Sequence, residues 1–263
     1  MSVSEREPKA AAPRLFRMDG LVALVTGAGA GIGRMAAASL AEAGAGIAVT
    51  DRDGAAANRV AKELGRNAAA FVIDVADEAA IVAGTRAVLE RFGRIDVLVN
   101  NAGIARRQST VEMSRETWDQ VMAVNLTGLF LMTREAVKPM LAQRSGSIVN
   151  IASIMGHVGG GLYPNPAYHA SKGAVVNLTR AWACEFGPCN VRCNAIAPTF
   201  VNTDLARPML SDPTMRAKLE SLHPLGRLAE VDDLAGAILY LASPASAMVT
   251  GHSLAVDGGW LSR

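Results

Sequence analysis

Residues Leu21–Gly33, LVALVTGAGAGIG, contain the pattern that decides the fold of this chain. Five consecutive apolar residues, 21 to 25, are typical of a strand buried on both faces of a parallel sheet. The glycine-rich segment after them predicts a tight turn, and the pattern from Arg34 to Ala43 predicts a helix that stops at Gly44. Strand, turn and helix in this order indicate an α/β fold with a parallel sheet.

The glycine spacing in this turn differs from the common G-x-G-x-x-G pattern, because Ile32 stands where the third glycine should be. The turn fits T-G-x-x-x-G-I-G instead, with Gly27 at the turn, Gly31 at the phosphate approach and Gly33 at the helix contact. Backbone N–H groups and a helix N-terminus in this context can hold a pyrophosphate. A turn of this kind without a ligand is the alternative interpretation.

An aspartate favours the ligand interpretation. Asp51 ends the next predicted strand, residues 46 to 50, about 20 residues after the glycine turn, where a carboxylate can bind both ribose hydroxyls of an adenosine. The same carboxylate would repel a 2′-phosphate, so we expect NAD as the cofactor and NADP as the less favoured one. Arg52 could receive a 2′-phosphate, whereas Ala30 adds no second positive charge to the turn.

The rest of the chain repeats the alternation of strands and helices. The predicted strands cover residues 69–73, 95–99, 147–152, 191–197 and 253–256, and the predicted helices cover 77–92, 115–143, 166–186 and 229–241. Pro139 is expected to kink or break its helix near the end. No repeat or linker divides the chain, so one domain over residues 18–263 is expected.

Two segments lie outside this alternation. Residues 1–17 are polar and without period, which predicts a mobile arm outside the fold. Residues 199–226 carry broken helical patterns with exposed-looking methionines at Met209 and Met215. We interpret them as a mobile lid over a substrate pocket, with a merely structural excursion as the alternative.

Composition excludes several classes of protein. The 263 residues include 26 basic and 24 acidic side chains, so no basic field for nucleic acid or an anionic membrane is present. No apolar run approaches the roughly 20 residues that span a bilayer, and the first residues lack the apolar centre of a signal peptide. We therefore expect a soluble, cytoplasmic protein with neither partner.

The three cysteines, Cys184, Cys189 and Cys193, lie close together, which raises the question of a metal site. Their spacing matches no zinc pattern, and no histidine follows at ligand distance. We therefore expect buried free thiols and no metal, as in a reducing compartment.

Polar residues at two further places suggest a site. The sequence Asn100-Asn101-Ala102-Gly103 follows a predicted strand and suits a wall against a cofactor, although the same residues also form ordinary loops. Asn125 lies among apolar residues of a predicted helix, so its amide must have hydrogen-bond partners.

Tyr168 and Lys172 lie four residues apart on a predicted helix, which brings their side chains onto one face with about 5 to 6 Å between Cβ atoms. An ammonium group beside a phenol favours the phenolate, so we expect the Tyr168 pKa to be drawn below its ordinary value of about 10. A surface tyrosine and a solvated lysine are the alternative interpretation. Ser153 precedes this pair, just beyond a predicted strand.

Taken in order, these motifs resemble the short-chain dehydrogenase/reductase family from Gly20 to the C-terminus. The resemblance rests on the following motifs: TGAGAGIG at 26–33, Asp74-Val75, NNAG at 100–103, Asn125, Ser153, YHASK at 168–172 and VRCNAIAP at 191–198. It implies one doubly wound, Rossmann-type fold with a seven-stranded parallel sheet in the order 3-2-1-4-5-6-7 and helices on both faces.

The resemblance also implies roles for individual residues. Tyr168 would be the general acid/base, Lys172 would hold the nicotinamide ribose and lower the Tyr168 pKa, Ser153 would bind the reacting oxygen, and Asn125 would fix a water in a proton relay. Asp74-Val75 would contact the adenine ring. The expected cofactor contacts are Gly27, Ala30, Gly31, Ile32, Gly33, Asp51, Arg52, Asp74, Val75, Asn101, Ala102, Gly103, Tyr168, Lys172, Pro198, Val201 and Thr203.

Departures from the family pattern bear on the substrate. Thr199 stands where a glycine usually follows the proline, and GGGLYPNP widens the loop before Tyr168. That loop, His157 and the closing VDGGW are similar to those of members that oxidise polyols and sugar acids. His157 could touch substrate hydroxyls, although a lone loop histidine is more often structural.

The expected activity is therefore NAD-dependent interconversion of a small secondary alcohol and a ketone. One alternative is reduction of 3-oxoacyl thioesters, which usually prefers NADPH and a basic residue where this chain has Ala30. A second alternative is a non-catalytic dinucleotide-binding sensor. Relatives commonly form tetramers through the helices at about 115–143 and 166–186, and both are apolar around more than one face here, so a homotetramer is expected.

Overall fold

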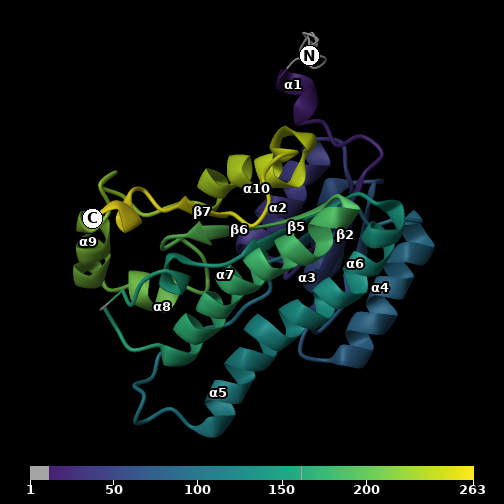
Figure 1. Ribbon diagram of the computed structural model, residues 1–263. Coiled ribbons are helices and arrows are strands. Elements are labelled where there is room, and N and C mark those ends of the chain that lie inside the picture. Colours follow the sequence, from purple (N-terminus) through teal and green to yellow (C-terminus); the bar gives the residue numbers. More distant parts are fainter. Residues whose placement is uncertain (1–11, 161) are drawn as a thin grey trace.

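Seven parallel strands form a single sheet at the centre of the molecule (Figure 1). The computed structural model describes residues 12–160 and 162–263. The strand order is β3-β2-β1-β4-β5-β6-β7, which confirms the predicted doubly wound α/β fold. The strands are β1 (Val22–Thr26), β2 (Gly46–Asp51), β3 (Ala68–Val72), β4 (Val97–Asn100), β5 (Gly146–Ile151), β6 (Val191–Pro198) and β7 (Ser253–Val256).

Helices cover both faces of the sheet (Figure 1). The α-helices are α1 (Ala12–Leu15), α2 (Gly31–Glu42), α3 (Gly54–Leu64), α4 (Glu78–Phe92), α5 (Arg115–Met122), α6 (Leu129–Gln143), α7 (Pro166–Phe186), α8 (Arg207–Leu210), α9 (Pro213–Ser221) and α10 (Ala235–Ala242). Short 3₁₀ segments are η2 (Ile154–Gly156), η3 (Gly187–Cys189), η4 (Val231–Leu234), η5 (Pro244–Ser246) and η6 (Trp260–Ser262).

The alternation of side chains along each strand produces two separate cores. Val25 of β1 points to the face covered by α2, α3 and α10, whereas its neighbour Leu24 points to the face covered by α4, α6 and α7. All five residues of β1 are buried, as the uninterrupted apolar run predicts. Because helices cover both faces of the sheet, side chains on both sides of a strand are buried, and the strand sequences are continuously apolar.

Side-chain caps fix several helix starts. The Asp77 carboxylate accepts from the backbone N–H groups of Ala79 and Ala80, and the Ser114 hydroxyl accepts from the Thr117 N–H. Asp53 caps α3 in the same way, although that helix was not predicted from its alanine-rich sequence. Each cap satisfies N–H groups that have no partner inside the helix.

The helix predicted at 115–143 is present but contains an irregularity. A π-helical segment, η1 (Ala123–Gly128), separates α5 from α6 and includes Asn125. Of the predicted kink or break at Pro139, the break is wrong, because α6 continues through this proline to Gln143. The last predicted helix begins with the 3₁₀ turn η4, which Glu230 and Asp233 cap reciprocally.

The two segments outside the alternation differ from expectation in part. Of the predicted arm, residues 1–11 lie outside the described part of the chain, while residues 12–15 form the helical turn α1 where none was expected. In the predicted lid, Met209 is buried and Met215 is partly buried, so the expectation that both are exposed is wrong. They pack with Phe200 and Trp260 in a third apolar cluster.

All three cysteines are free, but the expectation that they are buried holds for Cys193 alone. Cys184 is exposed and Cys189 is half-buried, whereas burial raises the pKa of the Cys193 thiol to about 12. Within the part of the chain that the structure describes, no cluster of three or more His, Cys, Asp or Glu side chains is suited to a metal ion. Within the same residues, no helix has the length and apolar character needed to cross a membrane.

The contact between Gly33 of α2 and the glycine turn leaves no room for a side chain. A Cβ atom at Gly33 would lie 2.2 Å from the Gly27 carbonyl oxygen and 2.5 Å from Asn101 Nδ2. We predict that Gly33→Ala lowers the free energy of unfolding by about 1 to 3 kcal/mol, the usual effect of forcing extra volume into a packed region. Urea unfolding at one fixed protein concentration measures this change.

The matched control is Gly236→Ala, because Gly236 also lies in a helix but nothing stands within 4 Å of its missing Cβ. There the better helix propensity of alanine should raise the free energy of unfolding by up to about 1 kcal/mol. Equal effects of the two substitutions would contradict the close contact at Gly33.

Candidate active site

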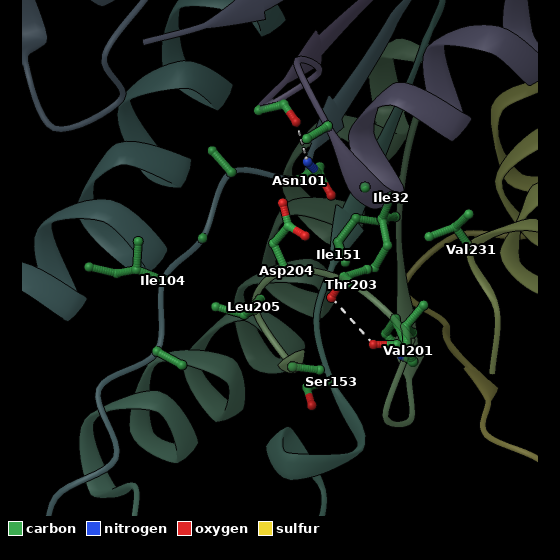
Figure 2. Close-up of a pocket in the computed structure, with 18 of the residues that line it drawn as sticks. Ile32, Asn101, Ile104, Ile151, Ser153, Val201, Thr203, Asp204, Leu205 and Val231 are labelled. Carbon is green, nitrogen blue, oxygen red and sulfur yellow. Dashed lines mark hydrogen bonds between the residues drawn. The ribbon is translucent and has the colours of Figure 1, made fainter. Parts of the chain in front are cut away.

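A cavity of about 1040 Å³ opens at the carboxyl ends of the strands, the usual ligand site of doubly wound sheets. Every predicted site residue lines it except Gly33 and Asn125, which lie behind its wall. Figure 2 shows that separate segments surround this cavity: Ile32 at the start of α2, Asn101 and Ile104 after β4, Ser153 after β5, and Thr203, Asp204 and Leu205 after β6.

One end of the cavity is formed by the glycine turn. Ala30 precedes α2 without a side-chain cap, so the first N–H groups of this helix are free to bind a ligand. Gly27 and Gly31 have φ angles of 62° and 53°, which favour glycine. Asn101 fixes the turn, since its Nδ2 donates to the carbonyl oxygens of Thr26 (2.8 Å) and Gly27 (3.0 Å). These features fit a pyrophosphate.

Asp51 lies beside this turn and is held by it. One carboxylate oxygen accepts from the Gly29 N–H and the other from the Asp53 N–H, both at 3.0 Å. A Cβ atom at Gly29 would lie 2.8 Å from Asp51 Oδ2, so this glycine is also required by a close approach. Gly29 was not among the predicted site residues, although the G-x-G at positions 27–29 is the signal that could have identified it.

The other end of the cavity, lined by Ser153, Tyr163 and Tyr168, is called the reaction end below. Ser153 precedes η2, and its hydroxyl accepts from the Met155 N–H at 3.1 Å. Tyr168 and Lys172 lie one turn apart on α7, as predicted, with the Lys172 Nζ 5.8 Å from the centre of the Tyr168 ring. Lys172 is buried and donates to the Ile151 carbonyl oxygen at 2.6 Å.

The pKa values of this pair differ from the sequence-based prediction. Burial raises the pKa of Tyr168 to about 12, although a hydrogen bond with Ser153 opposes the increase. Burial also lowers the pKa of Lys172 to about 8. The prediction that the pKa of Tyr168 lies below 10 is therefore wrong, because the loss of hydration outweighs the lowering by Ser153 and by the Arg107 charge.

Asn125 has the hydrogen-bond partners that its burial requires. Its Oδ1 accepts from the Ile104 N–H at 2.8 Å, while its Nδ2 donates to the Ile104 carbonyl at 2.9 Å and to the Ser171 hydroxyl at 3.1 Å. Ser171 in turn donates to the Tyr168 carbonyl at 2.9 Å. The amide thus connects the segment after β4 with the helix that carries Tyr168 and Lys172.

Two residues discussed from the sequence have structural contacts. His157 is exposed, does not line the cavity and bonds to the Ser253 hydroxyl at 2.9 Å, which supports its structural interpretation. Thr199, where a glycine was expected, contacts His223 with 2.5 Å between Oγ1 and Nε2. The His223 Nδ1 atom lies 2.7 Å from the Leu219 carbonyl oxygen, so this contact joins β6 to α9.

The sequence analysis also missed residues of the reaction end. Arg107, Tyr163 and Asn165 line the cavity, and the Arg107 guanidinium lies over the Tyr163 ring at 5.3 Å from its centre. Their only signal in the sequence was position, since Arg107 follows the NNAG segment and Tyr163 and Asn165 belong to the widened loop before Tyr168.

Comparison with known proteins gives a consistent result. A family model described as enoyl-(acyl carrier protein) reductase matches residues 27–261. The D-threitol dehydrogenase of Mycolicibacterium smegmatis is 44% identical over 248 residues, which cover 93% of this chain and 94% of the relative. The L-tagatose-forming galactitol 2-dehydrogenase of Cereibacter sphaeroides is 43% identical over 247 residues, covering 94% and 97%.

A solved structure is similarly close. The gluconate 5-dehydrogenase of Burkholderia cenocepacia, crystallised with NADP and tartrate, superimposes with a TM-score of 0.92 at 38% identity. The match covers 96% of this chain and 100% of that one. Since the fold, the ordered motifs and the matches over nearly whole chains agree, the protein belongs to the short-chain dehydrogenase/reductase family, oxidoreductases that act on CH–OH groups with a nicotinamide nucleotide.

Proposed function

We propose that this enzyme interconverts a secondary alcohol and a ketone on a polyol, a sugar or a sugar acid, with NAD as its cofactor. The observation that carries the proposal is the meeting of Ser153, Tyr168 and Lys172 at the reaction end of a cavity whose other end fits a dinucleotide. The similarity to dehydrogenases of threitol, galactitol and gluconate supports the substrate class.

In the proposed oxidation, the alcohol gives a hydride from its carbon to the nicotinamide and a proton from its oxygen to Tyr168. When bound, the nicotinamide supplies the hydride acceptor and, in its oxidised form, a positive charge. Tyr168 exchanges the proton with the substrate oxygen, which Ser153 holds by a hydrogen bond. Its raised pKa keeps Tyr168 protonated near neutral pH, the form that donates to a ketone oxygen during reduction. Oxidation needs the phenolate, which nearby positive charge favours.

Lys172 and Asn125 act in this proposal as positioning groups for the same proton transfer. Lys172 is buried and held by the Ile151 carbonyl, and with its pKa lowered to about 8 it can lose or regain a proton near working pH. Asn125 positions the neighbouring segments by its hydrogen bonds with the Ile104 N–H and the Ser171 hydroxyl. A water relay through Asn125 remains part of the proposal.

Asp51 supports NAD over NADP. Its carboxylate lies in the cavity at the end of β2 and accepts hydrogen bonds from two backbone N–H groups, which hold it in place. A 2′-phosphate bound there would be repelled by this fixed negative charge. Arg34 at this end of the cavity is paired with Glu63 at 2.8 Å, so Arg52, which follows Asp51 and also lines the cavity, is the positive group that a 2′-phosphate would have to use. Solved relatives include complexes with NADP and a complex with NADH, so the preference is a proposal for this chain alone.

The alternative activity is reduction of 3-oxoacyl thioesters, which is favoured by the match to a family model of acyl-carrier-protein reductases. The two activities differ in substrate and in the expected nucleotide. A non-catalytic sensor is disfavoured because Asn125, Ser153, Tyr168 and Lys172 are all retained. Residues 199–226 are proposed to act as the lid, since Val201, Thr203 and Leu205 line the cavity.

We predict that Tyr168→Phe retains NADH binding but loses turnover by about two to three orders of magnitude, because the phenylalanine ring cannot transfer a proton. Alcohol-dependent formation of NADH at 340 nm and NADH fluorescence titration measure the two quantities. Tyr240→Phe is the matched control, since Tyr240 lies on α10 outside the cavity and should leave turnover unchanged. Wild-type turnover in Tyr168→Phe would reject the proposed role.

We predict that Asp51→Asn lowers the ratio of kcat/KM for NAD to that for NADP by at least about tenfold, because it removes the charge that repels a 2′-phosphate. The ratio cancels any general loosening of the turn. Asp53→Asn is the control, because asparagine also caps helices and Asp53 does not line the cavity. An unchanged ratio in Asp51→Asn would remove the physical basis for the NAD preference.

We also propose a homotetramer formed through the helices 115–143 and 166–186. Phe130 on α6 is 45% exposed beside Leu126 and Leu178, an apolar surface that an assembly would cover. Light scattering should give about four times the chain mass of 27.4 kDa, and Phe130→Glu should reduce it. A mass of one chain for the unmodified protein would contradict the assembly.

A further inference from the structure

Two buried polar atoms near the reaction end have no hydrogen-bond partner among the described residues: Nε of Arg107 and Oδ1 of Asn165. Both residues line the same cavity as Tyr168. A buried donor or acceptor without a partner costs free energy, which a ligand with the complementary groups would recover. One atom is a cationic donor and the other is an acceptor, so the ligand must present both an acceptor and a donor.

Arg107 is held in place without being neutralised. Its guanidinium lies 5.3 Å from the centre of the Tyr163 ring, and Nη2 donates to the Leu205 carbonyl oxygen at 3.3 Å. The positive charge of Arg107 lowers the pKa of the Tyr163 phenol, although burial raises that pKa by more. Across residues 12–160 and 162–263 it forms no ion pair with a carboxylate. Its positive charge is therefore available to a ligand.

The other charged groups of the cavity are already engaged or lie elsewhere. Asp204 lines the cavity but is paired with Arg207, and Lys172 donates to a backbone carbonyl. Asp51 ends β2, Arg52 follows it and Asp74 lies just beyond β3, all at the end proposed for the adenosine. Arg34, on α2 at the same end, is paired with Glu63. Arg107 is close enough to the reacting centre that its charge lowers the pKa of Tyr168, although burial outweighs this effect.

Asn165 supplies the second contact. It is 3% exposed and directly precedes α7, and its backbone carbonyl oxygen lies 2.8 Å from the His169 Nδ1. The His169 Nε2 lies 3.0 Å from the Gly159 carbonyl oxygen, which ties this backbone to the widened loop. The backbone of Asn165 is thus fixed, while its side-chain oxygen is left to accept a hydrogen bond.

We propose that Arg107 and Asn165 form a subsite that binds the carboxylate and a neighbouring hydroxyl of a polyhydroxy acid. The planar guanidinium matches a carboxylate and binds it more strongly than a neutral hydroxyl. The amide oxygen accepts from a hydroxyl, which a polyhydroxy acid supplies next to its carboxylate. The enzyme therefore prefers aldonates to the neutral alditols of the same chain length. This inference rests on the proposed function and narrows its substrate class.

The test compares aldonates with alditols of matched chain length and configuration. The quantity measured is the ratio of kcat/KM for the aldonate to kcat/KM for the alditol, because a change in the Tyr168 pKa affects both substrates and cancels. Arg107→Gln should lower this ratio about 10- to 100-fold, as expected for loss of a charge-assisted hydrogen bond. Arg107→Lys keeps the charge but not the planar fork, so it should recover part of the loss.

Two further variants sharpen the test. Asn165→Asp has the same shape but places a negative charge beside the carboxylate, so it should also lower the ratio. Arg106→Gln is the matched control, because Arg106 is the adjacent arginine, is exposed and does not line the cavity. It should change the ratio by less than about threefold. Unfolding temperature and NADH affinity verify that each variant is folded.

The outcomes separate this inference from the proposed function. If the wild-type enzyme oxidises alditols and aldonates equally, or Arg107→Gln leaves the ratio unchanged, the subsite is overturned while the proposed function stands. If the enzyme oxidises neither and reduces 3-oxoacyl thioesters, the proposed function fails. In that case competitive inhibition by aldonates, measured in the wild type and in Arg107→Gln, tests the subsite, and equal inhibition constants overturn it.

Discussion

The structure depends on one close approach, in which the Asn101 amide donates to the carbonyl oxygens of Thr26 and Gly27. This contact joins the end of β4 to the turn after β1, and Gly33 packs against the same turn from α2. The carboxyl ends of the parallel strands meet at one edge of the sheet, where the cavity lies. The hydrogen bonds that fix this turn therefore also fix part of the cavity wall, since Gly27 and Asn101 both line it.

Burial is the second constraint, and it determines the protonation of the reaction end. Burial shifts the pKa of both groups toward the neutral form: it raises the pKa of Tyr168 to about 12 and lowers that of Lys172 to about 8, so the phenol stays protonated and the ammonium can lose a proton near working pH. The pKa values of the pair are therefore determined by burial more than by the presence of a cation beside a phenol. Asn125 contributes through geometry, since its hydrogen bonds connect the segment after β4 with α7.

The seven strands and most of the long helices could be predicted from the sequence, because periodicity and caps are local signals, whereas α1, α3 and the π-helical segment η1 were not. The strand order came from the family resemblance, and the boundaries of α7 and β7 agree with the predicted ranges. What could not be predicted depends on contacts between distant segments. The burial of Met209 requires Phe200 and Trp260, and the close approach of Gly29 requires Asp51. Likewise, the position of Arg107 beside Tyr163 is set by tertiary structure, since the two residues are far apart in the sequence.

The contact between Thr199 and His223 has a practical consequence for work with this protein. His223 also packs on Trp260 with ring centres 5.0 Å apart, and the guanidinium of Arg263, the last residue, lies 5.1 Å from the Trp260 ring. The C-terminal residues and α9 therefore share one packed cluster, whereas α1 lies well away from them (Figure 1). A substitution that removes the Trp260 ring would therefore disturb α9 together with the contact between Thr199 and His223, and so reach a segment that borders the cavity.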